Sequence, residues 1–258
     1  TREWDAVVIG GGPAGCSAAV TLARRGVRVL LVEAAQYPHE KVCGEFLSPE
    51  SAPLLDDLLG RGIVDRGATL QRVRLTTAGG AVWESELPGA AVSLSRGVLD
   101  LELAEAARQA GARVLTGTRV IALAGDLTKG FELRLQSKRS SERIRARAVV
   151  GAYGRRNRLD TQLSRPFKRV DQPYLGFKAH FSGPSVGERI ELHAFPGGYC
   201  GLSDIEDGRQ NVCMLVHRSA FAAANAGRSP SVDHLIDWIG RQNPALGERL
   251  RPAGQPAA

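Results

Sequence analysis

The first 33 residues of the chain join two apolar runs through a glycine-rich turn and a helical pattern. Residues 5–10 (DAVVIG) predict a buried strand, and residues 28–33 (RVLLVE) predict a second one. Residues 13–25 between them place small side chains on one helical face and begin with proline, which the first turn of a helix tolerates. A strand, a helix and a strand in this order predict a right-handed crossover between parallel strands.

The pattern continues with a hairpin and further helices. Two alternating runs meet at Gly79-Gly80, which is typical of a β-hairpin. Apolar residues recur every three or four positions between residues 97 and 110, as on one face of a helix. The elements expected in this region are a helix over 49–59, hairpin strands over 70–77 and 81–86, a helix over 97–110, and a third parallel strand over 112–115.

The later part of the chain changes character. Residues 119–150 predict three antiparallel strands that end in an apolar run at 146–150. Beyond residue 166, strand-like runs are separated by Gly, Pro and Asp turns, and helices come last. The expected elements are strands over 174–181, 189–195, 198–205 and 210–216, and helices over 218–226 and 231–241. We therefore expect two domains, with a boundary near residues 164–170.

Composition narrows the class of protein. With 43% hydrophobic and 24% charged residues in 258, the chain is an ordinary globular sequence. It has no run near the roughly 20 apolar residues that span a bilayer, and glycines interrupt the N-terminal apolar stretch, which argues against a signal peptide. Its four cysteines include no C-x-x-C pair, so we expect reduced thiols and a cytoplasmic location.

The formal net charge of +7 is less informative. The basic residues are mostly Arg and are spread along the chain, and the densest run, residues 138–147, alternates as on an exposed strand. A nucleic-acid-binding protein would show a clustered patch and a recognition module, so no nucleic-acid partner is expected. The positive field suits an anionic cofactor or a membrane surface equally well.

The motif that carries chemistry is Gly10-x-Gly12-x-x-Gly15, between the first strand and the first helix. Gly10 permits the tight turn, Gly12 lets a pyrophosphate approach the backbone, and Gly15 lets helix and strand pack closely. The diphosphate then meets unpaired N–H groups and the positive end of the helix dipole. Glu33, which ends the second strand, can accept hydrogen bonds from both ribose hydroxyls and would repel a 2′-phosphate. A glycine-rich turn without a ligand is the alternative interpretation.

Four stretches resemble FAD-dependent oxidoreductases of the geranylgeranyl reductase family, within the para-hydroxybenzoate hydroxylase-like superfamily. They are residues 8–15 with 31–34, residues 37–49 (YPHEKVCGEFLSP), residues 95–103 (SRGVLDLEL) and residues 149–156 (VVGAYGRR). The resemblance implies an α/β fold, with a Rossmann-like FAD-binding domain that has a parallel sheet and a β-meander. It also implies a second, antiparallel α+β substrate domain. We assign residues 1–165 to the first domain and 166–258 to the second, with the hairpin near residues 70–90 joining the second.

The resemblance also implies site residues. Arg96 would reach the diphosphate or ribityl region of the flavin, because a guanidinium stays charged and donates in a fork. A cation at a helix N-terminus opposes the helix dipole, which favours a ligand role for Arg96 over a surface role. The backbone of Val120 would face the adenine, and Lys41, Cys43 and Gly44 would lie near the isoalloxazine. A small buried residue without a ligand is the alternative interpretation of Cys43. The cofactor-binding residues expected overall are Gly10, Gly12, Pro13, Ala14, Gly15, Glu33, Ala34, Lys41, Cys43, Gly44, Arg96 and Val120.

Departures from the family pattern limit what carries over. The family's substrate-lining pattern is matched only at Pro196 and Tyr199, since Gly201 and Ser203 replace aromatic residues. Tyr153 stands where relatives often carry Asp, and the halogenase motif W-x-W-x-I-P is absent. The histidines lack zinc-binding spacing, so no metal is expected.

A third flavin segment of the family, a strand followed by Gly-Asp-Ala-Ala, is also missing. No Gly-Asp pair occurs after residue 160, so we expect the chain to be part of a longer protein and to retain FAD weakly or not at all by itself.

Three functions remain open on these grounds. The first is a reductase in which reduced flavin saturates an alkene of a hydrophobic, isoprenoid-like substrate, with NAD(P)H as an expected reductant. The second is an aromatic monooxygenase, and the third is a non-catalytic flavin-binding module. The residues that carry out catalysis and the oligomeric state are left open, and peripheral contact with a membrane would suit a lipid substrate.

Overall fold

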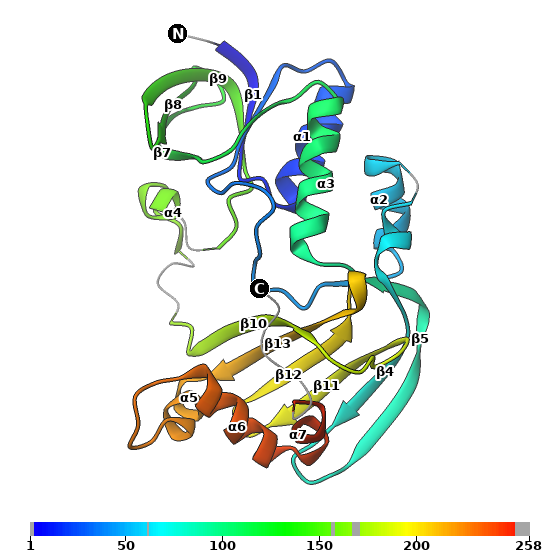
Figure 1. Ribbon diagram of the computed structural model, residues 1–258. Coiled ribbons are helices and arrows are strands. Elements are labelled where there is room, and N and C mark those ends of the chain that lie inside the picture. Colours follow the sequence, from blue (N-terminus) through cyan, green and yellow to red (C-terminus); the bar gives the residue numbers. More distant parts are fainter. Residues whose placement is uncertain (1–2, 61, 156–157, 167–170, 251–258) are drawn as a thin grey trace. The chain divides into compact units, whose positions relative to one another are not determined.

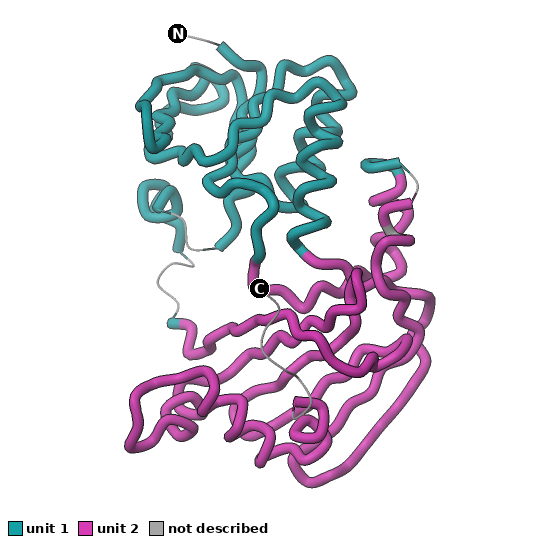
Figure 2. The backbone as a smooth tube through the Cα atoms, in the orientation of Figure 1, with its two compact units in different colours: residues 1–40, 57–60, 96–171 teal, residues 41–56, 61–95, 172–258 magenta. Residues whose placement is uncertain are grey.

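The computed structural model describes residues 3–60, 62–155, 158–166 and 171–250, and Figure 1 shows its helices and strands. The chain divides into two compact units, which Figure 2 colours separately. Each unit contains one β-sheet, and the chain passes between them repeatedly. Unit 1 comprises residues 1–40, 57–60 and 96–171, and unit 2 comprises residues 41–56, 61–95 and 172–258.

The sheet of unit 1 combines a parallel core with an antiparallel meander. Its strand order is β6-β2-β1-β9-β8-β7, with β1, β2, β6 and β9 parallel and β7 and β8 antiparallel to their neighbours. The strands are β1 (Glu3–Ile9), β2 (Val29–Val32), β6 (Arg113–Leu115), β7 (Thr118–Asp126), β8 (Gly130–Ser137) and β9 (Ser141–Gly151). All four residues of β2 are buried, as expected for a parallel strand in the middle of a sheet.

Two long helices of unit 1 pack side by side. They are α1 (Pro13–Arg24) and α3 (Arg96–Gln109), and a short helix, α4 (Arg158–Gln162), follows the meander (Figure 1). Small side chains on the buried face of α1, such as Ala19 and Ala23, allow the two helices to approach closely. The helices thus hold the first turn of α1 against the ends of β1 and β2.

The sheet of unit 2 has the order β10-β13-β12-β11-β4-β5-β3 and is antiparallel except for the parallel pair β4 and β11. The predicted hairpin near residues 70–90 therefore belongs to this sheet. Its strands are β3 (Phe46–Leu47), β4 (Ala68–Thr76), β5 (Val82–Ser93), β10 (Tyr174–Ser182), β11 (Arg189–Phe195), β12 (Gly198–Asp204) and β13 (Arg209–His217). The predicted α/β fold class, with a parallel sheet, a meander and a second, largely antiparallel sheet, is confirmed.

One face of this second sheet forms the core of unit 2. Three helices supply buried residues to it: α5 (Arg218–Ala224), α6 (Val232–Gln242) and α7 (Pro244–Leu250). Leu235, Ile239 and Leu246 of these helices are fully buried against Met214 and Val216 of β13. The side chains that alternate with these core residues along the strands point to the other face, which we call the opposite face.

The remaining elements are a helix, α2 (Ser51–Leu59), and two 3₁₀ turns at Val64–Arg66 and Glu206–Gly208. No helix within the described residues is both long and apolar enough to cross a lipid bilayer.

The predicted elements agree with the structure except in a few places. The second hairpin strand was expected to end at residue 86, but β5 continues to Ser93. Pro88 and Gly89 interrupt its pairing, and the register with β4 shifts there, so the two residues lie in an irregularity of the ladder rather than at its end. Three elements were not predicted, β3, α4 and α7, because two to seven residues are too few to establish a period.

The domain prediction placed one boundary near residues 164–170, of which 167–170 lie outside the described residues. The two compact units instead interleave along the chain, since residues 41–56 and 61–95 join unit 2. Sheet membership groups these segments, because they contain β3, β4 and β5.

Candidate functional site

The glycine-rich turn of unit 1 requires glycine at two positions for reasons of backbone geometry. Gly10 has a φ of +104°, and a Cβ there would lie 2.4 Å from the carbonyl oxygen of Ala152. A Cβ on Gly15 would lie 1.8 Å from the carbonyl oxygen of Gly10. The sequence prediction that these glycines serve a tight turn and close helix–strand packing agrees with this geometry.

The turn leads into a helix N-terminus that its own side chains leave uncapped. Gly12 is the N-cap residue of α1 and has extended backbone angles, and no side chain caps it. Pro13 occupies the first helical position, and the first turn contains no acidic residue. The free N–H groups and the positive end of the helix dipole therefore suit an anion such as a diphosphate.

Glu33 is a buried carboxylate that holds the turn in place. Its Oε2 accepts a hydrogen bond from the backbone N–H of Gly11 at 2.6 Å, and its Oε1 accepts one from Ala35 at 2.8 Å. A carboxylate oxygen has two lone pairs and can accept more than one hydrogen bond, which suits the predicted contact with a ribose hydroxyl. Glu33 thus has a structural role in addition to the predicted ribose-binding one.

Tyr37 and His39 adjoin this turn, and the sequence analysis gave neither of them a site role. The Tyr37 hydroxyl donates to the carbonyl oxygen of Gly11 and lies 3.8 Å from the sulfur of Cys16. Burial raises the pKa of Tyr37, so the phenol stays neutral. Both ring nitrogens of His39 are buried without a hydrogen-bond partner, and its ring leans on that of Tyr37 at 5.3 Å. Unpaired ring nitrogens beside an uncapped helix terminus fit a polar cofactor such as FAD.

Arg96 has a local partner that the sequence analysis did not foresee. Its guanidinium donates two hydrogen bonds to the carboxylate of Asp100, at 2.8 and 2.7 Å, one helical turn further along α3. Asp100 is fully buried. The unfavourable helix dipole therefore does not by itself indicate a ligand, because Asp100 offsets the charge of Arg96 in place. A flavin contact of Arg96 stays a prediction.

The other predicted positions of unit 1 lie in the sheet or just after it. Val120 is buried on β7, next to a register irregularity with β8. Tyr153 follows β9, and its hydroxyl donates to a carboxylate oxygen of Asp160 at 3.0 Å. The pair ties the segment after β9 to α4. Ala34 is exposed directly after β2.

Lys41, Cys43 and Gly44 belong to unit 2. The carbonyl oxygen of Cys43 accepts a hydrogen bond from the side-chain amide of Asn211 at 3.2 Å, and its sulfur accepts one from the N–H of Glu45 at 3.4 Å. This segment is therefore held against β13. Its partner residues come from far along the chain, which is why sequence reasoning missed Asn211.

Pro196 lies in the turn between β11 and β12, and Tyr199 lies near the start of β12. Tyr199 pairs with Leu215 across the strands and faces the opposite side of the sheet from the core. Large apolar side chains on this opposite face are exposed by 37–54%, and they include Leu75, Trp83, Tyr174, Tyr199 and Leu215. Such an exposed apolar surface is a candidate contact for a hydrophobic ligand.

A buried ion network lies on the core side of the same sheet. Glu191 is fully buried and accepts two hydrogen bonds from Arg249, at 2.7 and 2.9 Å. His193 lies 3.2 Å from the carboxylate, and the guanidinium groups of Arg189 and Arg74 lie 3.8 and 4.0 Å from it. Burial works to raise the pKa of this carboxyl, but the hydrogen bonds from His193 and Arg249 outweigh it and hold the pKa at about 2. The network anchors α7 to β11, and we assign it to stability.

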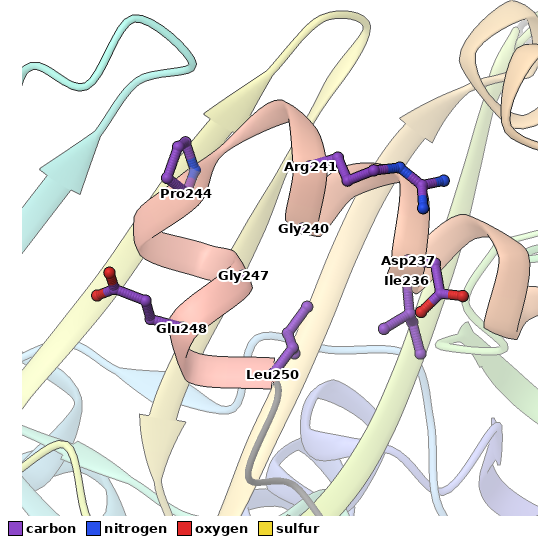
Figure 3. A pocket seen from close by; sticks show the side chains of 8 residues that line it. All are labelled: Ile236, Asp237, Gly240, Arg241, Pro244, Gly247, Glu248 and Leu250. Carbon is purple, nitrogen blue, oxygen red and sulfur yellow. The ribbon is translucent and has the colours of Figure 1, made fainter.

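Figure 3 shows a pocket of about 470 Å³ between α6 and α7. It is lined by Ile236, Asp237, Gly240, Arg241, Pro244, Gly247, Glu248 and Leu250. None of the predicted cofactor or substrate residues lines it, so the glycine turn and the opposite face remain the candidate sites.

The sequence profile of a protein family described as an FAD binding domain matches residues 3–185 of this chain. Two proteins of assigned function are similar over most of it. The menaquinone reductase of Mycolicibacterium smegmatis is 26% identical over 257 residues, covering 95% of this chain and 62% of its own. The digeranylgeranylglycerophospholipid reductase of Methanosarcina acetivorans is 30% identical over 227 residues, covering 81% and 53%.

Solved structures show the same fold at low sequence identity. A geranylgeranyl bacteriochlorophyll reductase-like protein from Thermoplasma acidophilum gives a TM-score of 0.78 at 19% identity, covering all of this chain and 65% of that protein. A myxobacterial FAD-dependent chondrochloren halogenase gives 0.79 at 23%, covering 98% and 61%. The chain thus spans about 60% of the length of the relatives it matches most fully.

Proposed function

Because this chain belongs to the FAD-binding domain family, we propose that it is the larger part of an FAD-dependent oxidoreductase that reduces carbon–carbon double bonds of a hydrophobic, isoprenoid-like substrate. The resemblance to the geranylgeranyl reductase family is confirmed by the relatives named above. Their names refer to a menaquinone and a digeranylgeranylglycerophospholipid, which are both lipids with isoprenoid chains.

The glycine turn is the observation that carries the proposal. Gly12 and the first turn of α1 would hold the diphosphate, and Glu33 would accept hydrogen bonds from the ribose. Arg96, Val120 and the segment around Cys43 are the further predicted contacts. A bound flavin supplies hydride transfer, while the protein contributes binding, orientation and exclusion of water.

The exposed apolar side chains on the opposite face of the unit 2 sheet are consistent with a hydrophobic substrate. Leu75 and Trp83 lie in one cross-strand row, and Tyr199 and Leu215 lie in a neighbouring row on the same face. An isoprenoid chain that covers these exposed side chains would remove apolar surface from water, which favours binding. Tyr199, one of the two predicted substrate residues, lies within this surface, and Pro196 lies beside it in the turn.

The first experiment measures flavin binding. FAD titrated into the chain and followed by quenching of flavin fluorescence is expected to saturate, with weak affinity. Glu33→Gln is expected to weaken binding about tenfold, because a neutral amide cannot accept hydrogen bonds on both of its terminal atoms. The exposed Glu188→Gln is the control. No saturable binding by the wild-type chain would overturn the proposal.

The second experiment measures the reaction. Under anaerobic conditions, with excess photoreduced FAD and geranylgeraniol as the probe, mass spectrometry is expected to show two hydrogens added for each double bond reduced. NAD(P)H, our proposed physiological reductant, is then tested in place of light. Oxygen-dependent hydroxylation of aromatic probes without alkene reduction would establish the monooxygenase alternative instead.

A further inference from the structure

A second buried carboxylate lies in unit 2, on the opposite face of the sheet from Glu191. Glu45 has no exposed side-chain surface. Its Oε1 forms an ion pair with Nζ of Lys178, and its Oε2 lies 2.8 Å from Nε2 of His180. The side chains of Lys178 and His180 are only 6% and 8% exposed. One buried carboxylate thus binds two groups that can each carry a proton.

This cluster joins the two ends of the sheet. Glu45 directly precedes β3, the last strand in the sheet order, whereas Lys178 and His180 belong to β10, the first. The segment that leads into β3 thus reaches the opposite face of β10, at the other end of the sheet order. The backbone of Glu45 has a φ of 55°, which non-glycine residues rarely adopt, and its carbonyl oxygen accepts a hydrogen bond from Leu94. The structure holds this residue in a strained conformation, as is common at functional sites.

The cluster and the exposed apolar surface lie on the same face. Lys178 pairs with Cys213, and the row continues across the sheet through Gly201 and Leu192 to Leu75 and Trp83. Paired residues in neighbouring strands point to the same side of a sheet. A lipid on the apolar surface would therefore lie on the side of the sheet from which Lys178 projects.

The chemistry of the partners distinguishes this cluster from the Glu191 network. Besides His193, Glu191 binds Arg249, whose guanidinium does not release its proton, and this network lies on the core side of the sheet, away from the exposed apolar surface. Glu45 instead binds a lysine and a histidine, both of which exchange protons readily.

We propose that Lys178 and His180, held and balanced in charge by Glu45, deliver the proton that completes reduction of the double bond. This inference rests on the proposed function. One carbon of the alkene accepts a hydride from the reduced flavin and the other accepts the proton. The π bond is replaced by two C–H bonds, the flavin is oxidised, and the cluster regains its proton from water. Glu45 is the positioning residue for both donors.

Binding is tested first, in the flavin-free chain. Geranylgeraniol is titrated while fluorescence and the imidazole NMR signal of His180, assigned with His180→Gln, are recorded. Binding is expected to change Trp83 emission, identified with Trp83→Phe, and to shift the His180 signal. Emission that changes while the His180 signal stays fixed would overturn the inference, because the bound alkene would not reach the cluster. No change in either signal overturns it also, along with the proposed substrate face.

Reduction is tested next with saturating FAD. His180→Gln and Glu45→Gln are each expected to lower kcat about 100-fold or more while KM stays within twofold. Glu188→Gln is the control and is expected to leave both constants unchanged. Because Glu45→Gln leaves Lys178 buried without its partner, circular dichroism checks the fold. The neutral double variant Glu45→Gln/Lys178→Met replaces it if the single variant unfolds.

The outcomes separate the two proposals. If the wild type reduces the alkene and the folded variants keep the wild-type kcat, the proton-delivery role is overturned and the reductase function remains intact. A wild type that binds FAD but adds no hydrogen to geranylgeraniol overturns the reductase function, and the proton-delivery role with it. A loss of kcat in the variants with unchanged lipid binding supports both.

Discussion

Replacing Glu191 by glutamine removes the charge at the centre of the ion network beneath α7. In the wild type the pKa of this carboxyl is about 2 rather than 4.5, because hydrogen bonds from His193 and Arg249 outweigh the effect of burial. By linkage, this difference contributes about 3 kcal/mol to the free energy of unfolding. Since the folded pKa is the lower one, the contribution is fully present above pH 5 and is lost as the pH falls from 4.5 towards 2.

Urea unfolding measured between pH 7 and pH 2.5 tests this magnitude. Trp238 is a suitable reporter of unit 2, because its ring packs edge-on against Phe195 at 6.3 Å in the core. The difference in unfolding free energy between wild type and Glu191→Gln is expected to be large at pH 7 and to shrink by most of 3 kcal/mol by pH 2.5. The difference at pH 7 is large because Glu191→Gln removes the buried carboxylate and leaves Arg249 without its charged partner.

Glu188→Gln, an exposed change three residues earlier, is the control and is expected to shift stability by less than about 0.5 kcal/mol at every pH. If the difference between wild type and Glu191→Gln stayed constant from pH 5 to pH 2.5, the carboxyl would have the same pKa in the folded and the unfolded state. The assignment of the network to stability would then be refuted.

Three further changes test other parts of the structure. Gly15→Ala is expected to abolish FAD binding and to lower the melting temperature of unit 1, because the new Cβ would lie 1.8 Å from a backbone carbonyl oxygen. Gly79→Ala is the control and should do neither, since the nearest atom to its new Cβ would be 3.9 Å away. Burial raises the pKa of the Cys200 thiol, so iodoacetamide at pH 8 should label Cys200 only after urea unfolding. Mass spectrometry detects the label, and labelling of Cys200 in the folded chain would contradict its burial. Arg96→Met should cost about 3 kcal/mol in urea unfolding, because it leaves the buried carboxylate of Asp100 unpaired, and a loss below 1 kcal/mol would argue against that pair.

Local sequence patterns were sufficient to predict the parts of the candidate site that residues close together in the chain form. The turn between β1 and α1, the uncapped N-terminus of α1 and the place of Glu33 at the end of β2 all follow from a stretch of 33 residues. Each element there has a strong period and a distinct end signal. The resemblance to flavin-dependent reductases drew on the same short segments.

Contacts between distant residues were beyond such patterns. The sequence analysis took the dipole misfit of Arg96 as a sign of function, but the buried carboxylate of Asp100 on the next turn of the same helix gives it a structural partner. It passed over Tyr37 and Asn211, because their partners at Gly11 and Cys43 lie 26 and 168 residues away.

The sequence by itself determined the nucleotide-binding turn and most of the helices and strands, because hydrophobic period and turn residues act over a few positions. Only the tertiary structure decided which polar groups share a face. Glu45 and Lys178 are 133 residues apart and meet because the segment that leads into β3 reaches β10, at the other end of the sheet order. The order in which seven strands pair places these residues together, and no single segment encodes that order.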